Sequence, residues 1–173
     1  MTAASQMVRA AVMVSDLKRS REFYEDVLGF TEVFVENARG AGGSSHLLLG
    51  MPSTITSRIC ILKPPGKPAY GMLGLFEFND PKPPALTRNG DGANVGEAIL
   101  VFYAEDLDEV TRKIQARGLR IIGGPMPYRV NGRVKQREMI FCGPDGEKIN
   151  LIEWNVAKAD AGDRPEKWKG DPE

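Results

Sequence analysis

The stretch from Val8 to Glu36 contains a complete pattern of strand, capped helix, glycine stop and second strand. It begins with the apolar run VRAAVMV, followed by Ser-Asp, which is a helix-start signal, and by LKRSREFYEDVL. Gly29 then ends the helix, and TEVFVE alternates polar and apolar residues as a half-buried strand does. The helical spacing places four residues on the face expected to be buried: Leu17, Tyr24, Val27 and Leu28.

The same order recurs in the second half of the chain. VMVSDL, which begins at Val12, matches FYAEDL, which begins at Phe102, an offset of 90 residues. GLFEFN at Gly74 matches NLIEWN at Asn150, an offset of 76 residues. The two offsets differ because the first half carries an additional glycine-rich loop. Joining two such units covers the apolar sheet face that each leaves exposed and opens a groove between them. The sequence therefore predicts an α+β fold, in which two βαβββ modules form a curved, open eight-stranded sheet around a groove, with the helices outside.

The repeat and the local composition also predict where each module ends. Residues 80–96 are rich in proline and glycine and nearly free of apolar side chains, as a connection between packed units is. We expect a first module over residues 7–79, a linker over 80–96 and a second module over 97–155. Residues 156–173 are polar and charged, and we expect a tail that is loose or lies across the surface.

Charge and cysteine content exclude several classes of function. The 173 residues include 23 Lys and Arg and 23 Asp and Glu, so no net field draws the chain to nucleic acid or to an anionic membrane. The N-terminal sequence predicts neither a secretory signal nor a membrane span, which favours a cytoplasmic protein. Cys60 and Cys142 lie in apolar strand-like runs without metal or redox spacing, and both are expected to be buried thiols.

Three motifs resemble the vicinal oxygen chelate superfamily of glyoxalases, bleomycin resistance proteins and extradiol dioxygenases. The motifs are VSDLKRSREFYEDVLGF, AEDLDEVTRKIQARGL and CGPDGEKINLIEW, and they extend over most of the chain, from about Val8 to Trp154. The resemblance implies the fold described above and a homodimer. It does not select one activity, because the superfamily includes lyases, epimerases, dioxygenases, thiol transferases and ligand-sequestering proteins.

In its metal-dependent members, the superfamily places His, Gln or Glu ligands on the first and last strand of each module. The resemblance implies that the equivalent positions here are Arg9, Gly74, Ile99 and Asn150. Arginine has no lone pair to give, glycine and isoleucine have no side-chain donor, and asparagine alone is a weak ligand. Strand alternation also turns the nearby carboxylates of Glu77 and Glu153 to the other face of each sheet. The sequence therefore predicts no metal site and no cofactor.

Four side chains are candidates for chemistry in the groove. Arg9 suits a carboxylate, phosphate or enolate oxygen, and its alternative is a strand arginine paired with an acid. Asn150 either orients a substrate or is a satisfied buried amide. Glu138, in the strand QREMIFC, is either a groove-facing base or a carboxylate at a wet edge. His46, the only histidine, is either a general base or an exposed loop residue, and it begins a segment that is a helical turn or a lid.

Two tyrosines complete the candidate set. Tyr103 lines the groove or packs within its strand, and Tyr128 is a substrate contact at the mouth or part of a solvated loop. Together these residues predict a metal-independent lyase or isomerase that acts on an oxygenated carboxylate or aromatic metabolite. Arg9 and Asn150 would hold a developing oxyanion, while Glu138 or His46 would move a proton. Two alternatives stay open, a protein that binds and sequesters a small molecule, and a metal-dependent glyoxalase or dioxygenase with displaced ligands.

Overall fold

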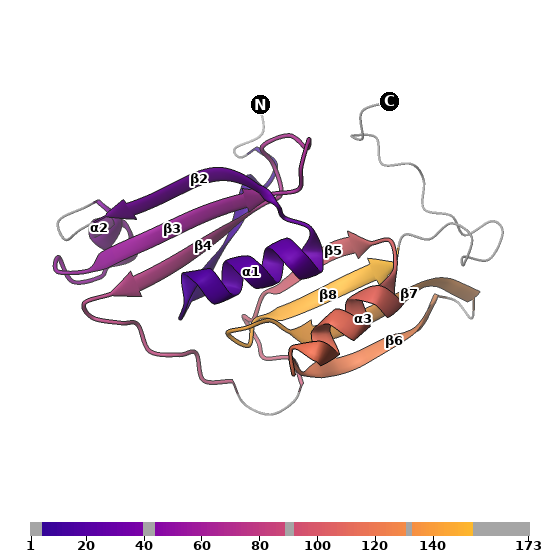
Figure 1. The fold of residues 1–173 in the computed structure, drawn as a ribbon. Coiled ribbons are helices and arrows are strands. Elements are labelled where there is room, and N and C mark those ends of the chain that lie inside the picture. The colour runs from indigo at the N-terminus through magenta and orange to yellow at the C-terminus, as the bar shows by residue number, and fades with distance from the viewer. Residues whose placement is uncertain (1–4, 40–43, 89–91, 131–132, 154–173) are drawn as a thin grey trace. The chain divides into compact units, whose positions relative to one another are not determined.

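The computed structural model describes residues 5–39, 44–88, 92–130 and 133–153 (Figure 1). The chain divides into two compact units, Met1–Val95 and Gly96–Glu173. Each unit contains one open four-stranded sheet, with strand order β1-β4-β3-β2 in the first and β5-β8-β7-β6 in the second. The predicted α+β class with eight strands is confirmed, and the strands form two sheets of four. The groove expected between the modules stays a prediction.

The first unit follows the predicted order, with one additional short helix. Its elements are β1 (Arg9–Val14), α1 (Leu17–Leu28), β2 (Glu32–Arg39), α2 (Ser45–Leu49), β3 (Thr56–Lys63) and β4 (Met72–Asn79). β1 pairs with β4 in parallel, and the other neighbouring strands are antiparallel. The segment that begins at His46, expected as a helical turn or a lid, forms the single-turn helix α2. Residues 40–43 of the glycine-rich loop and the predicted tail, 156–173, lie outside the described residues.

The second unit repeats this arrangement. Its elements are β5 (Ile99–Ala104), α3 (Leu107–Ala116), β6 (Ile121–Val130), β7 (Arg133–Cys142) and β8 (Lys148–Glu153). Arg9 pairs with Met72 in the first unit and Ile99 with Lys148 in the second. The offsets of 90 and 76 residues convert one pair into the other, so the two units share their strand register as well as their order.

Both long helices begin at the predicted aspartate. Asp16 Oδ1 accepts a hydrogen bond from the backbone N–H of Arg19 at 3.0 Å, and α1 ends at Gly29, whose φ of 72° is the left-handed conformation that favours glycine. Asp106 Oδ1 accepts from the backbone N–H groups of Asp108 and Glu109, at 2.9 and 3.1 Å. These caps satisfy backbone donors that have no partner within the helix, which explains why both helices start where the sequence indicates.

Three of the four residues expected on the buried face of α1 are buried, namely Leu17, Tyr24 and Val27. The fully buried residues of α1 and α3 are Leu17, Ser20, Phe23, Tyr24, Val27, Leu107 and Ile114. Each large apolar side chain that leaves water contributes roughly 1.5–3 kcal/mol to folding, so these two faces account for much of the stability of each unit. Leu28 is only half-buried, because it lies at the end of α1. Among the described residues, no helix is long and apolar enough to span a membrane.

Each sheet has one face turned towards its helix. In the second unit, Thr111 of α3 approaches Met139 of β7, with 3.7 Å between the hydroxyl oxygen and the sulfur. The neighbours of Met139 therefore point away from the helix, since side chains alternate along a strand. We call this opposite surface the helix-distal face of each sheet. Cys60 faces the helix side and is buried, whereas Cys142 is half-buried, because it ends β7 on the helix-distal face.

Candidate functional site

Three polar side chains are in contact on the helix-distal face of β7 and β8. Gln136 Nε2 donates a hydrogen bond to Glu138 Oε1 at 2.5 Å, and Asn150 Nδ2 donates to Glu138 Oε2 at 3.2 Å. Gln136 and Glu138 are half-buried, and Asn150 is only 8 % exposed. We call these residues the carboxylate–amide cluster. The structure thus brings together two predicted site residues, Glu138 and Asn150, and adds Gln136, which the sequence reasoning missed.

The amide of Asn150 has a defined orientation. Its Nδ2 also donates to the backbone carbonyl of Met139 at 3.2 Å. A carbonyl oxygen only accepts hydrogen bonds, so the group that points at it must be the NH₂. Both N–H groups are therefore used, and Oδ1, which makes no hydrogen bond within the described part of the chain, is not sealed from solvent. Asn150 offers an acceptor, which does not suit the predicted role of holding an oxyanion.

The cluster occurs in only one of the two units. Glu138 pairs with Ile152 in the second sheet, and the repeat makes this pair equivalent to Ile59 and Phe76 in the first. By the same register, Ser57, Ile59 and Gly74 occupy the three positions of the cluster in the first unit. Because the first sheet forms without these polar groups, the fold itself does not require them.

A buried ion pair lies near the cluster. Lys148 Nζ is 2.6 Å from Glu97 Oε2, and the two side chains are 8 % and 6 % exposed. Lys148 lies two residues before Asn150 on β8, so both side chains belong to the helix-distal face. The sequence reasoning missed this pair, although a lysine at the start of the apolar strand KINLIE is an available signal.

The two candidate tyrosines flank the cluster. Tyr103 of β5 pairs with Ile152, the residue that also pairs with Glu138 from the other side. Tyr128 of β6 pairs with Gln136. Both rings are about half exposed. The register places both rings on the same face as Glu138, since paired residues of neighbouring strands point the same way.

Arg9 and His46 belong to the first unit. Arg9 is exposed on the helix-distal face of β1, and its Cδ lies 3.5 Å from the position that a Cβ of Gly74 would take. A Cβ at Gly74 would lie 2.6 Å from Cε2 of Phe76 and would collide with this ring. Glycine at this position therefore leaves space for the ring. His46 is half-buried in α2.

The residues at the superfamily's ligand positions do not fit a metal ion. Arg9 contributes a cation, and neither Gly74 nor Ile99 has a side-chain donor. Asn150 presents one amide oxygen, because its nitrogen is committed to Glu138 and to a backbone carbonyl. Within the ranges that the structure describes, no group of three or more His, Cys, Asp or Glu side chains is arranged to hold a metal.

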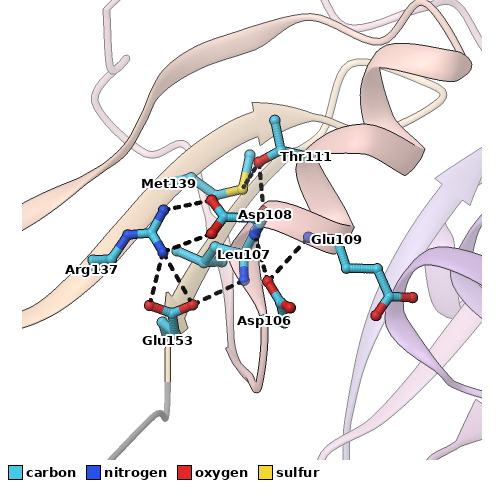
Figure 2. Close-up of polar contacts among 8 residues, drawn as sticks. All are labelled: Asp106, Leu107, Asp108, Glu109, Thr111, Arg137, Met139 and Glu153. Atoms are coloured by element: carbon cyan, nitrogen blue, oxygen red, sulfur yellow. Dashed lines mark hydrogen bonds and ion pairs between the residues drawn. The ribbon is translucent and has the colours of Figure 1, made fainter. Parts of the chain in front are cut away.

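The carboxylates of Glu77 and Glu153 point towards the helices, as strand alternation predicted. Figure 2 shows Glu153 at the start of α3, where Oε1 accepts the backbone N–H of Leu107 at 3.1 Å and Oε2 lies 3.3 Å from Nη1 of Arg137. Arg137 also binds Asp108 at 2.7 Å, and this hydrogen bond raises the pKa of the guanidinium. These residues form a helix-start clamp on the face opposite the carboxylate–amide cluster.

Similarity to known proteins extends over most of the chain. The model of the Glyoxalase/Bleomycin resistance protein/Dioxygenase superfamily matches residues 6–151. A 2-epi-5-epi-valiolone epimerase from Actinomyces sp. is 28% identical over 144 residues, which cover 82% of this chain and 75% of that protein.

Solved structures share the fold. A glyoxalase family protein from Bacillus cereus has a TM-score of 0.67 at 19% identity, covering 88% of this chain and 97% of that one. An antibiotic binding protein from Streptomyces sp. has a TM-score of 0.54 at 23% identity, covering 88% of this chain and 98% of that one. By the family match and by its fold, this chain belongs to the Glyoxalase/Bleomycin resistance protein/Dioxygenase superfamily.

Proposed function

We propose that this protein is an isomerase that moves a proton at a carbon next to the carbonyl of an oxygenated small molecule, without a metal ion. The observation that most supports this proposal is the carboxylate of Glu138, which two amide groups hold in place on a half-buried sheet face. A positioned carboxylate is a usual general base for such a proton. The similarity to an epimerase favours an isomerase over a lyase.

In this proposal, Glu138 removes the proton from carbon and the carbonyl oxygen becomes an enolate oxygen. The role predicted for Arg9 from the sequence is to stabilise that oxygen with its guanidinium. Inversion of the carbon requires a proton to return to the opposite side of the enolate. The sequence predicts proton transfer by Glu138 or His46, and His46→Asn tests whether the histidine takes part in this return step. Tyr103 and Tyr128 contact the substrate from the two strands that flank the cluster.

The test is proton exchange in D₂O with a panel of ketones that includes 2-hydroxycyclohexanone and a pentahydroxycyclohexanone. NMR measures both deuterium uptake at the carbon next to the carbonyl and the formation of the epimer. Glu138→Gln should lower kcat by about 100-fold or more, the usual contribution of a general base. His46→Asn should slow epimer formation more than deuterium uptake, because proton removal does not need it.

Two controls make the result specific. Glu22→Gln is the same substitution on the exposed surface of α1, and it should leave both rates unchanged. Prolonged dialysis against a chelator should also leave the wild-type rate unchanged. An exchange rate that survives Glu138→Gln would refute the role of this carboxylate, and a rate restored by a divalent metal after dialysis would refute metal independence.

A second candidate function is binding and sequestration of a small molecule. The observation that favours it is the set of exposed apolar and aromatic side chains on β5: Ile99, Val101 and Tyr103. Such a surface binds a ligand without any proton carrier. Saturable binding of a ketone or an aromatic compound, with no deuterium uptake in any member of the panel, would identify this function instead.

The third reading, a metal-dependent enzyme with displaced ligands, needs His46 and carboxylates to converge on one ion. It would gain support only from the metal-restored rate named above. A homodimer in the cytoplasm is also part of the proposal, and sedimentation equilibrium measures its stoichiometry.

A further inference from the structure

We infer that the carboxylate–amide cluster recognises a substrate through its hydroxyl groups, so that the substrate class is a polyhydroxylated ketone. This inference rests on the proposed function, which places the cluster beside the reacting carbon. It goes beyond that function by naming the chemical groups on the rest of the substrate. It also differs from the carboxylate or aromatic metabolite expected from the sequence.

The inference is based on the hydrogen-bond donors and acceptors that the cluster leaves available to a ligand. Each oxygen of Glu138 receives one amide N–H and has a further lone pair. Asn150 presents Oδ1, since its two N–H groups are used, and Gln136 presents its own carbonyl oxygen and one N–H. The surface that meets a ligand thus consists mainly of hydrogen-bond acceptors. A ligand hydroxyl donates to such groups, whereas a ligand carboxylate or phosphate would meet the negative charge of Glu138.

The acceptors are also close together. Asn150 Nδ2 lies 3.2 Å from Glu138 Oε2, so the Oδ1 of the same amide is a near neighbour of the carboxylate. Two adjacent acceptors suit two hydroxyl groups on neighbouring carbons, which is the arrangement in a polyol. A ligand with a single hydroxyl would bond only one of the two acceptors.

The contrast between the two units indicates that these acceptors serve a ligand. The equivalent positions of the first unit are Ser57, Ile59 and Gly74, and that sheet forms with the same register. Placing polar groups in a half-buried sheet costs free energy unless they are bonded. In the second unit one of them, Asn150, is more than nine-tenths buried, and its Oδ1, which has no protein partner in the described residues, stays open to solvent. A hydroxyl-rich ligand takes the place of water as the donor to this oxygen.

The experiment measures equilibrium binding by calorimetry, which does not depend on turnover. The probes are a pentahydroxycyclohexanone and cyclohexanone, which differ only in the hydroxyl groups. A hydrogen bond to a charged group changes affinity by roughly 10-fold or more and one to a neutral group by roughly 5-fold, so one hydroxyl bonded to Glu138 and one to Asn150 should give the wild type a preference of about 50-fold. Asn150→Leu keeps the size of the side chain but removes the acceptor together with the two N–H groups that bond Glu138 and the Met139 carbonyl, and it should reduce the preference by about 5-fold or more.

Two further variants make the outcome decisive. Gln136→Leu removes a half-buried acceptor at the edge of the same cluster, and it replaces Asn150→Leu if thermal unfolding shows that the latter does not fold. Asn79→Leu makes the same chemical change on the helix side of β4 and should leave the preference unchanged. Equal wild-type affinity for the two ketones, absence of binding, or an equal effect of the control variant would overturn the inference. A hydroxyl preference without Glu138-dependent exchange would support the substrate class while refuting the isomerase.

Discussion

The helix-start clamp predicts that two equivalent glutamates contribute very differently to stability. Glu153 and Glu77 occupy the same position in the two repeats, and each accepts the first backbone N–H of its helix, at 3.1 and 3.3 Å. The side chain of Glu153 is 1 % exposed and that of Glu77 is 13 % exposed. The perturbations to compare are Glu153→Gln and Glu77→Gln, which keep the shape of the side chain and remove its charge.

The expected difference follows from the arginine that each glutamate meets. Arg137 is 23 % exposed and Asp108 fixes it at 2.7 Å, whereas Arg58, the partner of Glu77, is 56 % exposed. Breaking a buried ion pair lowers the free energy of unfolding by about 3–5 kcal/mol when the remaining charge has no other partner. Because Arg137 still pairs with Asp108, we expect a smaller loss of about 2–3 kcal/mol for Glu153→Gln. An exposed pair contributes about 0–1 kcal/mol, which sets the cost of Glu77→Gln.

Amide hydrogen exchange, followed in individual peptides, measures the local stability of each unit separately. Glu153→Gln should accelerate exchange in α3 by about 30-fold or more and leave α1 unchanged, because about 2 kcal/mol of local stability is lost. Asp108→Asn serves as the control, since it removes only the partly exposed half of the clamp. Equal losses in the two glutamate variants, or a larger loss for Glu77→Gln, would refute the reasoning from burial.

Three further predictions concern other groups. Lys148→Met removes the ammonium group that pairs with the buried carboxylate of Glu97 and should lower the free energy of unfolding by about 3–5 kcal/mol, whereas adding Glu97→Met should restore it to within about 1 kcal/mol; urea denaturation measures both. The backbone hydrogen bond from Arg19 lowers the pKa of Asp16, so this carboxylate stabilises the fold above its unfolded pKa and stops doing so as pH falls through the folded value. The difference in stability between wild type and Asp16→Asn should therefore shrink below about pH 4, and a constant difference down to pH 2 would contradict this. Burial raises the pKa of the Cys60 thiol, so a disulfide reagent at pH 8 should modify it more slowly than the half-buried second cysteine, and equal rates would contradict this.

The helices and the repeat were predictable because their signals are local. Asp16 and Asp106 bond backbone groups only two or three residues away, so their role is visible in the sequence. The orientation of strand faces was predictable for the same reason, since alternation along one strand fixes which side chains share a face. Glu77 and Glu153 point to the helices as this rule requires.

The chemistry of the cluster was less predictable because it depends on pairing between strands. Glu138 and Gln136 are neighbours along β7, but only the register of β7 with β8 places Asn150 beside them. That register also sets the Met139 carbonyl against the amide of Asn150 and so determines which end of the amide a ligand meets. Lys148 and Glu97 are 51 residues apart, and no local pattern joins them.

The two repeats separate the residues that the fold needs from those that it does not. On the helix-facing side, arginine and glutamate recur in both units, as Arg58 with Glu77 and as Arg137 with Glu153, because each helix needs a partner for its first N–H groups. On the helix-distal side the equivalent positions differ, and an isoleucine in the first unit corresponds to Glu138 in the second. A position that can be apolar in one unit and charged in the other is not required by packing. The charge at Glu138 therefore calls for an explanation outside folding, and a bound substrate is the explanation that its acceptor-rich surroundings favour.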